Sequence, residues 1–123
     1  MGRTKADLRA ALDDLGLSIR EAGTVLKTGR TLQGWCNESS YGTAPDSVWE
    51  ALGELRDAQE DEAAELASAA MAGRPLPYLA SQAASDAIHG DGMPYAFHNS
   101  ASRKAARELE RRGVAFHFEY RGA

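Results

Sequence analysis

The part of the chain that most constrains the fold is residues 17–35, whose sequence is LSIREAGTVLKTGRTLQGW. Ser18 followed by Glu21 matches a capping box, in which each side chain accepts a hydrogen bond from the backbone amide of the other residue. A second helix is expected to start at Thr28, whose hydroxyl can cap its first turn. The inward face of that helix would carry Leu32 and Trp35. The segment therefore predicts two short helices joined by a tight turn.

Another helix is expected just before this segment. Thr4 with Asp7 forms a second capping box, and the apolar spacing that follows predicts a helix over residues 5–15, which Gly16 ends. Three short helices in succession predict a small helical bundle at the N-terminal end.

A long connecting helix is expected to begin near Asp46, where a proline directly precedes it. Gln59 and Glu62 interrupt its apolar stripe, so we expect a partly exposed helix rather than a strict coiled coil. The helical pattern then breaks at a glycine and two prolines, Gly73, Pro75 and Pro77. This break predicts two domains, residues 1–73 and residues 74–123.

The C-terminal domain is expected to be a small α+β unit. After a short helix, alternating side chains predict a strand at residues 95–98, followed by a helix capped by Asn99 or Ser100. Strict alternation over residues 114–120 predicts a second, half-buried strand. The predicted fold class is therefore mainly α, with an N-terminal helix-turn-helix bundle followed by a strand-helix-strand unit.

The two predicted strands suggest self-association. Two short strands around one helix bury too little apolar surface to offset their ordering entropy, so we expect pairing with a second copy. The apolar side chains expected at this dimer interface are Tyr95, Phe97, Val114, Phe116, Phe118 and Tyr120. The chain is accordingly expected to be a homodimer.

The exposed side chains of the predicted helix at residues 28–36 have the chemistry to read double-stranded DNA. In the major groove an arginine can bond both acceptors of guanine, and a glutamine can bond both edge groups of adenine. We expect base contacts from Arg30, Thr31 and Gln33. Polar and basic side chains around the turn predict phosphate contacts from Ser18, Arg20, Lys27, Thr28, Asn37 and Tyr41. The alternative is a plain helical bundle whose exposed side chains are only solvated.

The net charge of −4 is unevenly distributed. Residues 1–49 hold six basic and six acidic side chains, residues 50–73 one and seven, and residues 74–123 seven and five. The acidic excess therefore belongs to the long connecting helix, which would repel phosphate and should face away from DNA.

Three stretches, LSIREAGTVL, GRTLQGW and PDSVWEALGELRDAQ, resemble phage and bacterial Cro and C1-type helix-turn-helix repressors. Within that group the chain is most similar to the small anti-CRISPR-associated autoregulators and their YdiL-like relatives, which share a tryptophan near Trp35 and a Pro-Asp helix start near Pro45 and Asp46. The resemblance covers about half the chain, and the span from Leu26 to Trp35 is one residue shorter than in common repressors. It implies a dimeric, autoregulatory repressor with an N-terminal DNA-binding unit and a C-terminal dimerisation unit.

We therefore expect a transcriptional repressor that binds an inverted-repeat DNA operator as a homodimer. The second hypothesis is a protein-binding module, such as an antitoxin or a phage-encoded inhibitor, whose C-terminal unit captures a protein partner through its aromatic side chains.

Enzymatic and metal chemistry are not expected. The three histidines, His89, His98 and His117, have no nearby cluster of Asp, Glu or Cys at ligand spacing in the sequence, so they are expected to be surface or interface residues. No nucleophile with a base is apparent, so no enzyme, metal or cofactor is predicted. No apolar run approaches the roughly 20 residues of a membrane span, and the charged N-terminus does not look like a secretory signal, so a cytoplasmic protein is expected.

Overall fold

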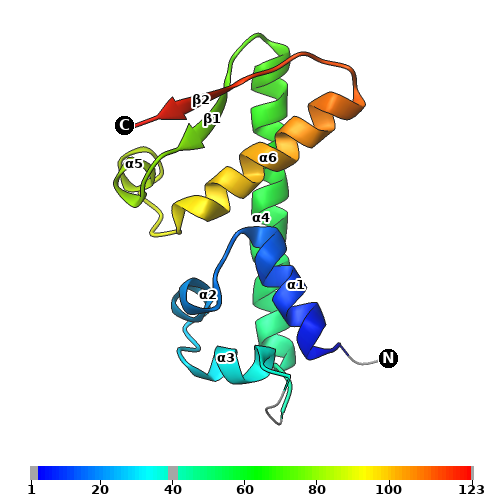
Figure 1. Ribbon diagram of the computed structural model, residues 1–123, viewed down its shortest axis with the longest axis vertical. Coiled ribbons are helices and arrows are strands. Elements are labelled where there is room, and N and C mark those ends of the chain that lie inside the picture. The colour runs from blue at the N-terminus through cyan, green and yellow to red at the C-terminus, as the bar shows by residue number, and fades with distance from the viewer. Residues whose placement is uncertain (1–2, 39–41, 123) are drawn as a thin grey trace. The chain divides into compact units, whose positions relative to one another are not determined.

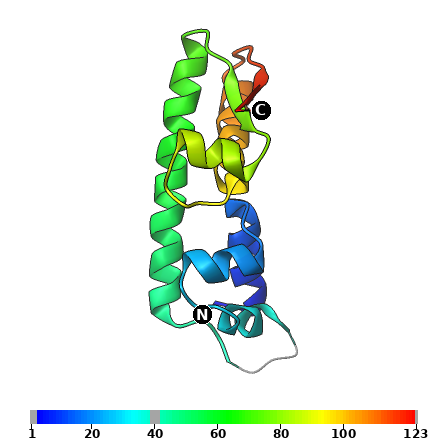
Figure 2. The same cartoon turned by 90° about the vertical axis from the view of Figure 1, so that its left-hand side faces the viewer.

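The computed structural model describes residues 3–38 and 42–122, which form two compact units, Met1–Arg56 and Asp57–Ala123. The described chain is mainly helical, with one small two-stranded sheet, which confirms the predicted mainly α class (Figure 1). Helix α4 (Asp46–Met71) starts where the sequence predicts and belongs to both units, as the continuous helix in Figure 2 shows. Among the described helices, none combines the length and apolar character needed to cross a membrane.

The first unit contains α1 (Lys5–Leu15), α2 (Ile19–Val25), α3 (Thr31–Cys36) and the start of α4. Both predicted capping boxes are present, and each satisfies backbone amides that the first helical turn leaves unpaired. The apolar faces of these helices pack together into a leucine-rich core: Leu8, Leu12, Leu15, Leu17, Leu32 and Leu52.

Helix α3 begins three residues later than predicted. Its N-cap is Arg30, which has helical dihedral angles and makes no capping hydrogen bond through its side chain. The Thr28 hydroxyl caps nothing and is buried without a partner among the described residues. The prediction of Thr28 as a helix cap is therefore wrong, because residues 28–30 continue the turn between the two helices.

The second unit contains β1 (Leu76–Leu79), α5 (Gln82–Ile88), α6 (Tyr95–Arg111) and β2 (Phe118–Arg121), together with the second part of α4. Strands β1 and β2 pair in parallel, with Leu76 opposite Phe118 and Leu79 opposite Arg121. Parallel strands need a long crossover connection, and α5 and α6 supply it. The second unit therefore has the order strand, two helices, strand.

The predicted strand at residues 95–98 is wrong, because these residues form the first turn of α6. Pro94 precedes the helix, and the Tyr95 backbone amide donates to Gln82 Oε1 at 3.0 Å, so a side chain of α5 satisfies the start of α6. Asn99 and Ser100, predicted as caps, are buried within the helix. The N-terminal strand of the sheet is instead β1, at the two prolines where the sequence predicts only a break.

Small side chains line the core of the second unit. Ala63, Ala67 and Ala70 of α4 pack with Ala105 and Ala106 of α6, beside buried Leu76 and Leu109. Alanine at these positions lets two helices approach closely and leaves little room for rearrangement. The half-buried side chains of Val114 and Phe116 cover this core.

Candidate functional site

A tight turn connects α2 to α3. The Gly23 carbonyl oxygen accepts hydrogen bonds from the amides of Thr28 at 2.9 Å and Gly29 at 3.1 Å, which folds the turn back onto α2. Lys27 and Gly29 both have φ of 59°, in the left-handed region. The turn is therefore locked by backbone bonds.

Helix α3 is held from its inner side and from its end. Leu32 is fully buried between the helices of the first unit, and α3 packs against both α1 and α2. The Lys5 ammonium donates to the Gly34 carbonyl at 2.9 Å, which places a positive charge at the C-terminal end of α3, where the helix dipole favours it. The opposite face of α3 is left exposed on a fixed support.

The three side chains predicted to contact bases, Arg30, Thr31 and Gln33, are all exposed on that face. Arg30 and Gln33 line a groove of about 510 Å³ together with Arg20 of α2. Its remaining lining residues are Ile19, Thr24 and Gly29. Helices α2 and α3 thus bring two guanidinium groups and one amide to the same open groove.

The predicted phosphate-contacting residues divide into three groups. Ser18, Arg20, Lys27 and Asn37 are exposed. Thr28 is removed from the set, because its hydroxyl is buried and its amide is bonded to Gly23. Tyr41 lies outside the described residues. The Ser18 hydroxyl accepts from the Glu21 amide and keeps its own proton for a further acceptor.

The side chains predicted to form a dimer interface also divide. Phe97 is only 4% exposed, and Val114 and Phe116 pack against the core of their own unit. These three side chains therefore make contacts within the chain rather than at a dimer interface. The other three, Tyr95, Phe118 and Tyr120, are 37%, 41% and 76% exposed. Tyr78 of β1 makes edge contacts with the rings of both Phe118 and Tyr120, so the exposed aromatics of the sheet form one continuous patch.

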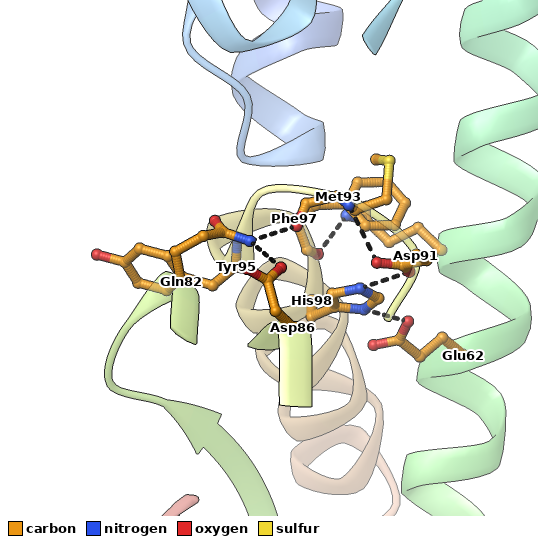
Figure 3. Close-up of polar contacts among 9 residues, drawn as sticks. Glu62, Gln82, Asp86, Asp91, Met93, Tyr95, Phe97 and His98 are labelled. Atoms are coloured by element: carbon orange, nitrogen blue, oxygen red, sulfur yellow. Dashed lines mark hydrogen bonds and ion pairs between the residues drawn. The ribbon is translucent and has the colours of Figure 1, made fainter. Parts of the chain in front are cut away.

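His98 does not have the environment predicted for the histidines. His98 lies on α6 with its side chain buried between two carboxylates: Nδ1 is 2.7 Å from Glu62 Oε1, and Nε2 is 2.9 Å from Asp91 Oδ2 (Figure 3). The ring of His89 stacks on that of His98, with centroids 3.5 Å apart and planes 3° apart. The expectation of a surface or interface residue is wrong for His98, which is buried within its own unit because α4 and the loop after α5 bring carboxylates to α6.

The two stacked histidines have opposite pKa shifts. Burial acts to lower the pKa of His98, but hydrogen bonds and charge attraction from Glu62 and Asp91 outweigh it and raise that pKa above the usual 6.5. Burial and the nearby positive charge of His98 lower the pKa of His89. The surroundings therefore favour the charged form of His98 and the neutral form of His89.

His117 is unlike the other two. It precedes β2, is exposed, and has Nε2 3.5 Å from Glu119 Oε1. His98 lies on helix α6, so the two histidines are not on neighbouring strands.

One sequence signal for the histidine cluster existed. Gln59 and Glu62, noted as breaks in the apolar stripe of α4, both face α6: Gln59 donates to the Phe97 carbonyl at 2.8 Å, and Glu62 bonds His98. Polar residues at inward helical positions indicate buried polar partners. Nothing in the local sequence identifies which partners these are.

Comparison of the chain with models of known protein families gives no match, and comparison with curated protein sequences gives none either.

Proposed function

We propose that the chain is a sequence-specific double-stranded DNA-binding protein, a transcriptional repressor that acts as a homodimer, with α2 and α3 serving as a helix-turn-helix. The observation that carries the proposal is the exposed groove where Arg20, Arg30 and Gln33 meet, on helices whose opposite faces are buried. Arginine and glutamine are the side chains best able to make bidentate contacts with purine edges in the major groove.

Electrostatics support the same surface. The exposed cations Arg20, Lys27 and Arg30 lie on α2, the turn and the start of α3, and Glu21 bonds its own helix start rather than a neighbouring cation. Such a patch attracts phosphate locally although the whole chain is acidic, so binding should be salt-dependent and modest on non-specific DNA.

Two-fold symmetry completes the proposal. The α3 helix has only six residues and reads few base pairs, so useful affinity requires two copies. The patch of Tyr78, Phe118 and Tyr120 is the surface that we assign to pairing of two chains. A symmetric dimer predicts an inverted repeat whose half-sites lie roughly 34 Å apart, one helical turn of DNA.

Selection of bound duplexes from a random library tests the proposal, with a salt titration on the enriched site. An inverted repeat with a steep salt dependence supports it. Absence of an enriched sequence, together with only weak salt-sensitive binding, contradicts it.

The aromatic patch also favours the second candidate, a module that captures a protein partner. Tyr78, Tyr95 and Tyr120 line an open groove with Arg103, which donates to the Tyr78 hydroxyl at 2.9 Å. Co-purification from the native host separates the two candidates: a stoichiometric protein that protects these tyrosines favours the module, and a DNA-competent dimer without it favours the repressor.

A further inference from the structure

We propose that Glu62, His89 and His98 form a binding site for a divalent transition-metal ion, and that Zn²⁺ is the ion that fits best. The three residues come from α4, the C-terminal end of α5 and α6, and each offers one ligand atom within 4.8 Å of the others. The site lies entirely within the second unit.

The donor set identifies the class of ion. Two imidazole nitrogens and one carboxylate suit zinc and its neighbours in the first transition row, whereas Ca²⁺ and Mg²⁺ prefer oxygen ligands. Zinc accepts three protein ligands when a water molecule or another small ligand fills the fourth position.

His98 has the supporting contacts of a metal ligand. Histidine ligands usually donate their second ring N–H to a carboxylate, which orients the ring and makes the other nitrogen a better donor. His98 Nε2 lies 2.9 Å from Asp91 Oδ2, and Asp91 Oδ1 in turn accepts from the Met93 amide at 3.0 Å (Figure 3). Nδ1, which faces Glu62, is left as the metal-binding atom.

The metal would replace the proton between His98 and Glu62. Ligand atoms about 2.0–2.2 Å from a tetrahedral ion lie roughly 3.3 Å from one another. The observed 2.7 Å between His98 Nδ1 and Glu62 Oε1 therefore has to widen slightly, and binding releases the proton.

Binding of the metal ion requires a larger movement of His89 than of His98 and Glu62. A ring nitrogen binds a metal in the plane of its ring, so two parallel stacked rings cannot both point at one ion. His89 must therefore turn out of the stack. It is exposed and caps the C-terminal end of a seven-residue helix, so its side chain has the freedom to do so.

An adjoining cavity gives the fourth position access to solvent. Glu62, His89 and His98 line a pocket of about 260 Å³ with Ser102, Leu66 and Arg121. Leu66, Leu79 and Ile88 give the pocket an apolar side, which strengthens binding of the ion to its charged ligand. A single water molecule or small anion fits beside the ion.

Titration of the full chain with Zn²⁺, and with Co²⁺ as a coloured substitute, tests the site. We expect one ion per chain and a visible Co²⁺ spectrum of tetrahedral type. His89→Ala should weaken Zn²⁺ binding at least tenfold, and Asp91→Asn should weaken it about 10- to 100-fold. The matched control is His117→Ala, which removes an exposed histidine of the same unit and should leave affinity unchanged.

Folding is monitored separately, because His98 is buried and Glu62 is partly buried in the unit. The His89→Ala variant changes an exposed side chain, and its far-UV circular dichroism should equal that of the parent. In NMR spectra of the parent, the ring signals of His89 and His98 should shift on addition of Zn²⁺ while those of His117 stay in place. Equal Zn²⁺ affinity for His89→Ala and the parent, or ring shifts confined to His117, overturns the proposal.

Discussion

Gly23 lies so close to Gly29 that a Cβ atom added to Gly23 would come within 2.7 Å of the Gly29 carbonyl oxygen. Gly23 therefore allows close packing between α2 and the turn that follows it. Only a residue without a side chain lets the turn fold onto α2. The position of this turn sets the position of α3.

Gly23→Ala is therefore expected to destabilise the first unit by about 1 to 3 kcal/mol, because backbone cannot move away as a flexible side chain could. Urea unfolding followed by tryptophan fluorescence measures the change. Gly53→Ala in α4 is the control, since nothing lies within 4 Å of its added Cβ. Gly53→Ala should stabilise the chain by up to about 1 kcal/mol, because alanine has a higher helix propensity than glycine. Equal effects of the two substitutions would show that the close contact between Gly23 and Gly29 is unimportant.

Arg30→Ala is expected to relax DNA specificity and to cost about 1 to 3 kcal/mol of binding free energy on the selected site. Lys27→Ala should instead weaken binding to all sequences alike and lower the slope of log affinity against log salt by about one. Fluorescence anisotropy at several salt concentrations distinguishes them. Arg107→Ala changes an exposed arginine of α6 and should alter neither quantity.

Asn99→Ala is expected to destabilise the second unit by at least about 2 kcal/mol. The buried Asn99 amide accepts from the Leu79 backbone N–H at 2.7 Å and donates to the Leu79 carbonyl at 3.0 Å, as a neighbouring strand would. Alanine leaves both groups of β1 unpaired. Denaturant unfolding measures the loss, and a decrease well below 1 kcal/mol would show that these two bonds are not needed to pair this strand edge.

The histidine stack predicts a pH dependence of stability, measured with a chelator present. The folded pKa of His98 is raised, so its charged form stabilises the unit fully below the unfolded value of about 6.5, and this contribution is lost as pH rises through the folded pKa. His89 acts in the opposite direction, because its pKa is lowered and its contribution is lost as pH falls. His89→Ala should therefore steepen the loss of unfolding free energy as pH rises above about 6.5. A flat profile in this variant would show that the two carboxylates do not hold the proton on His98.

Tyr120→Glu is expected to weaken self-association at least tenfold, because a charge would have to be desolvated in the proposed interface. Tyr120 is 76% exposed in the single chain, so the free energy of unfolding of the monomer should change little. Sedimentation equilibrium over a range of concentrations measures the dimer constant. Ala115→Glu adds the same charge at an exposed position three residues before β2 and serves as the control.

Local sequence determined the elements whose signals are complete within a few residues. The capping boxes at Thr4 and Ser18 and the proline before Asp46 place three helix starts correctly, because a cap satisfies backbone amides of its own first turn. The outward face of α3 also follows from local spacing once Leu32 is placed inside.

Tertiary structure decided the rest, since the information is shared between distant segments. Four alternating residues from Tyr95 to His98 fit a strand and a helix equally well, and only burial of Phe97, Ala101, Ala105 and Leu109, four residues apart, selects the helix. Likewise, the two hydrogen-bond partners of the His98 ring are Glu62, 36 residues earlier in the chain, and Asp91, in the loop after α5. Sequence spacing alone does not reveal such a cluster, because its members come together only when α4 and α6 pack.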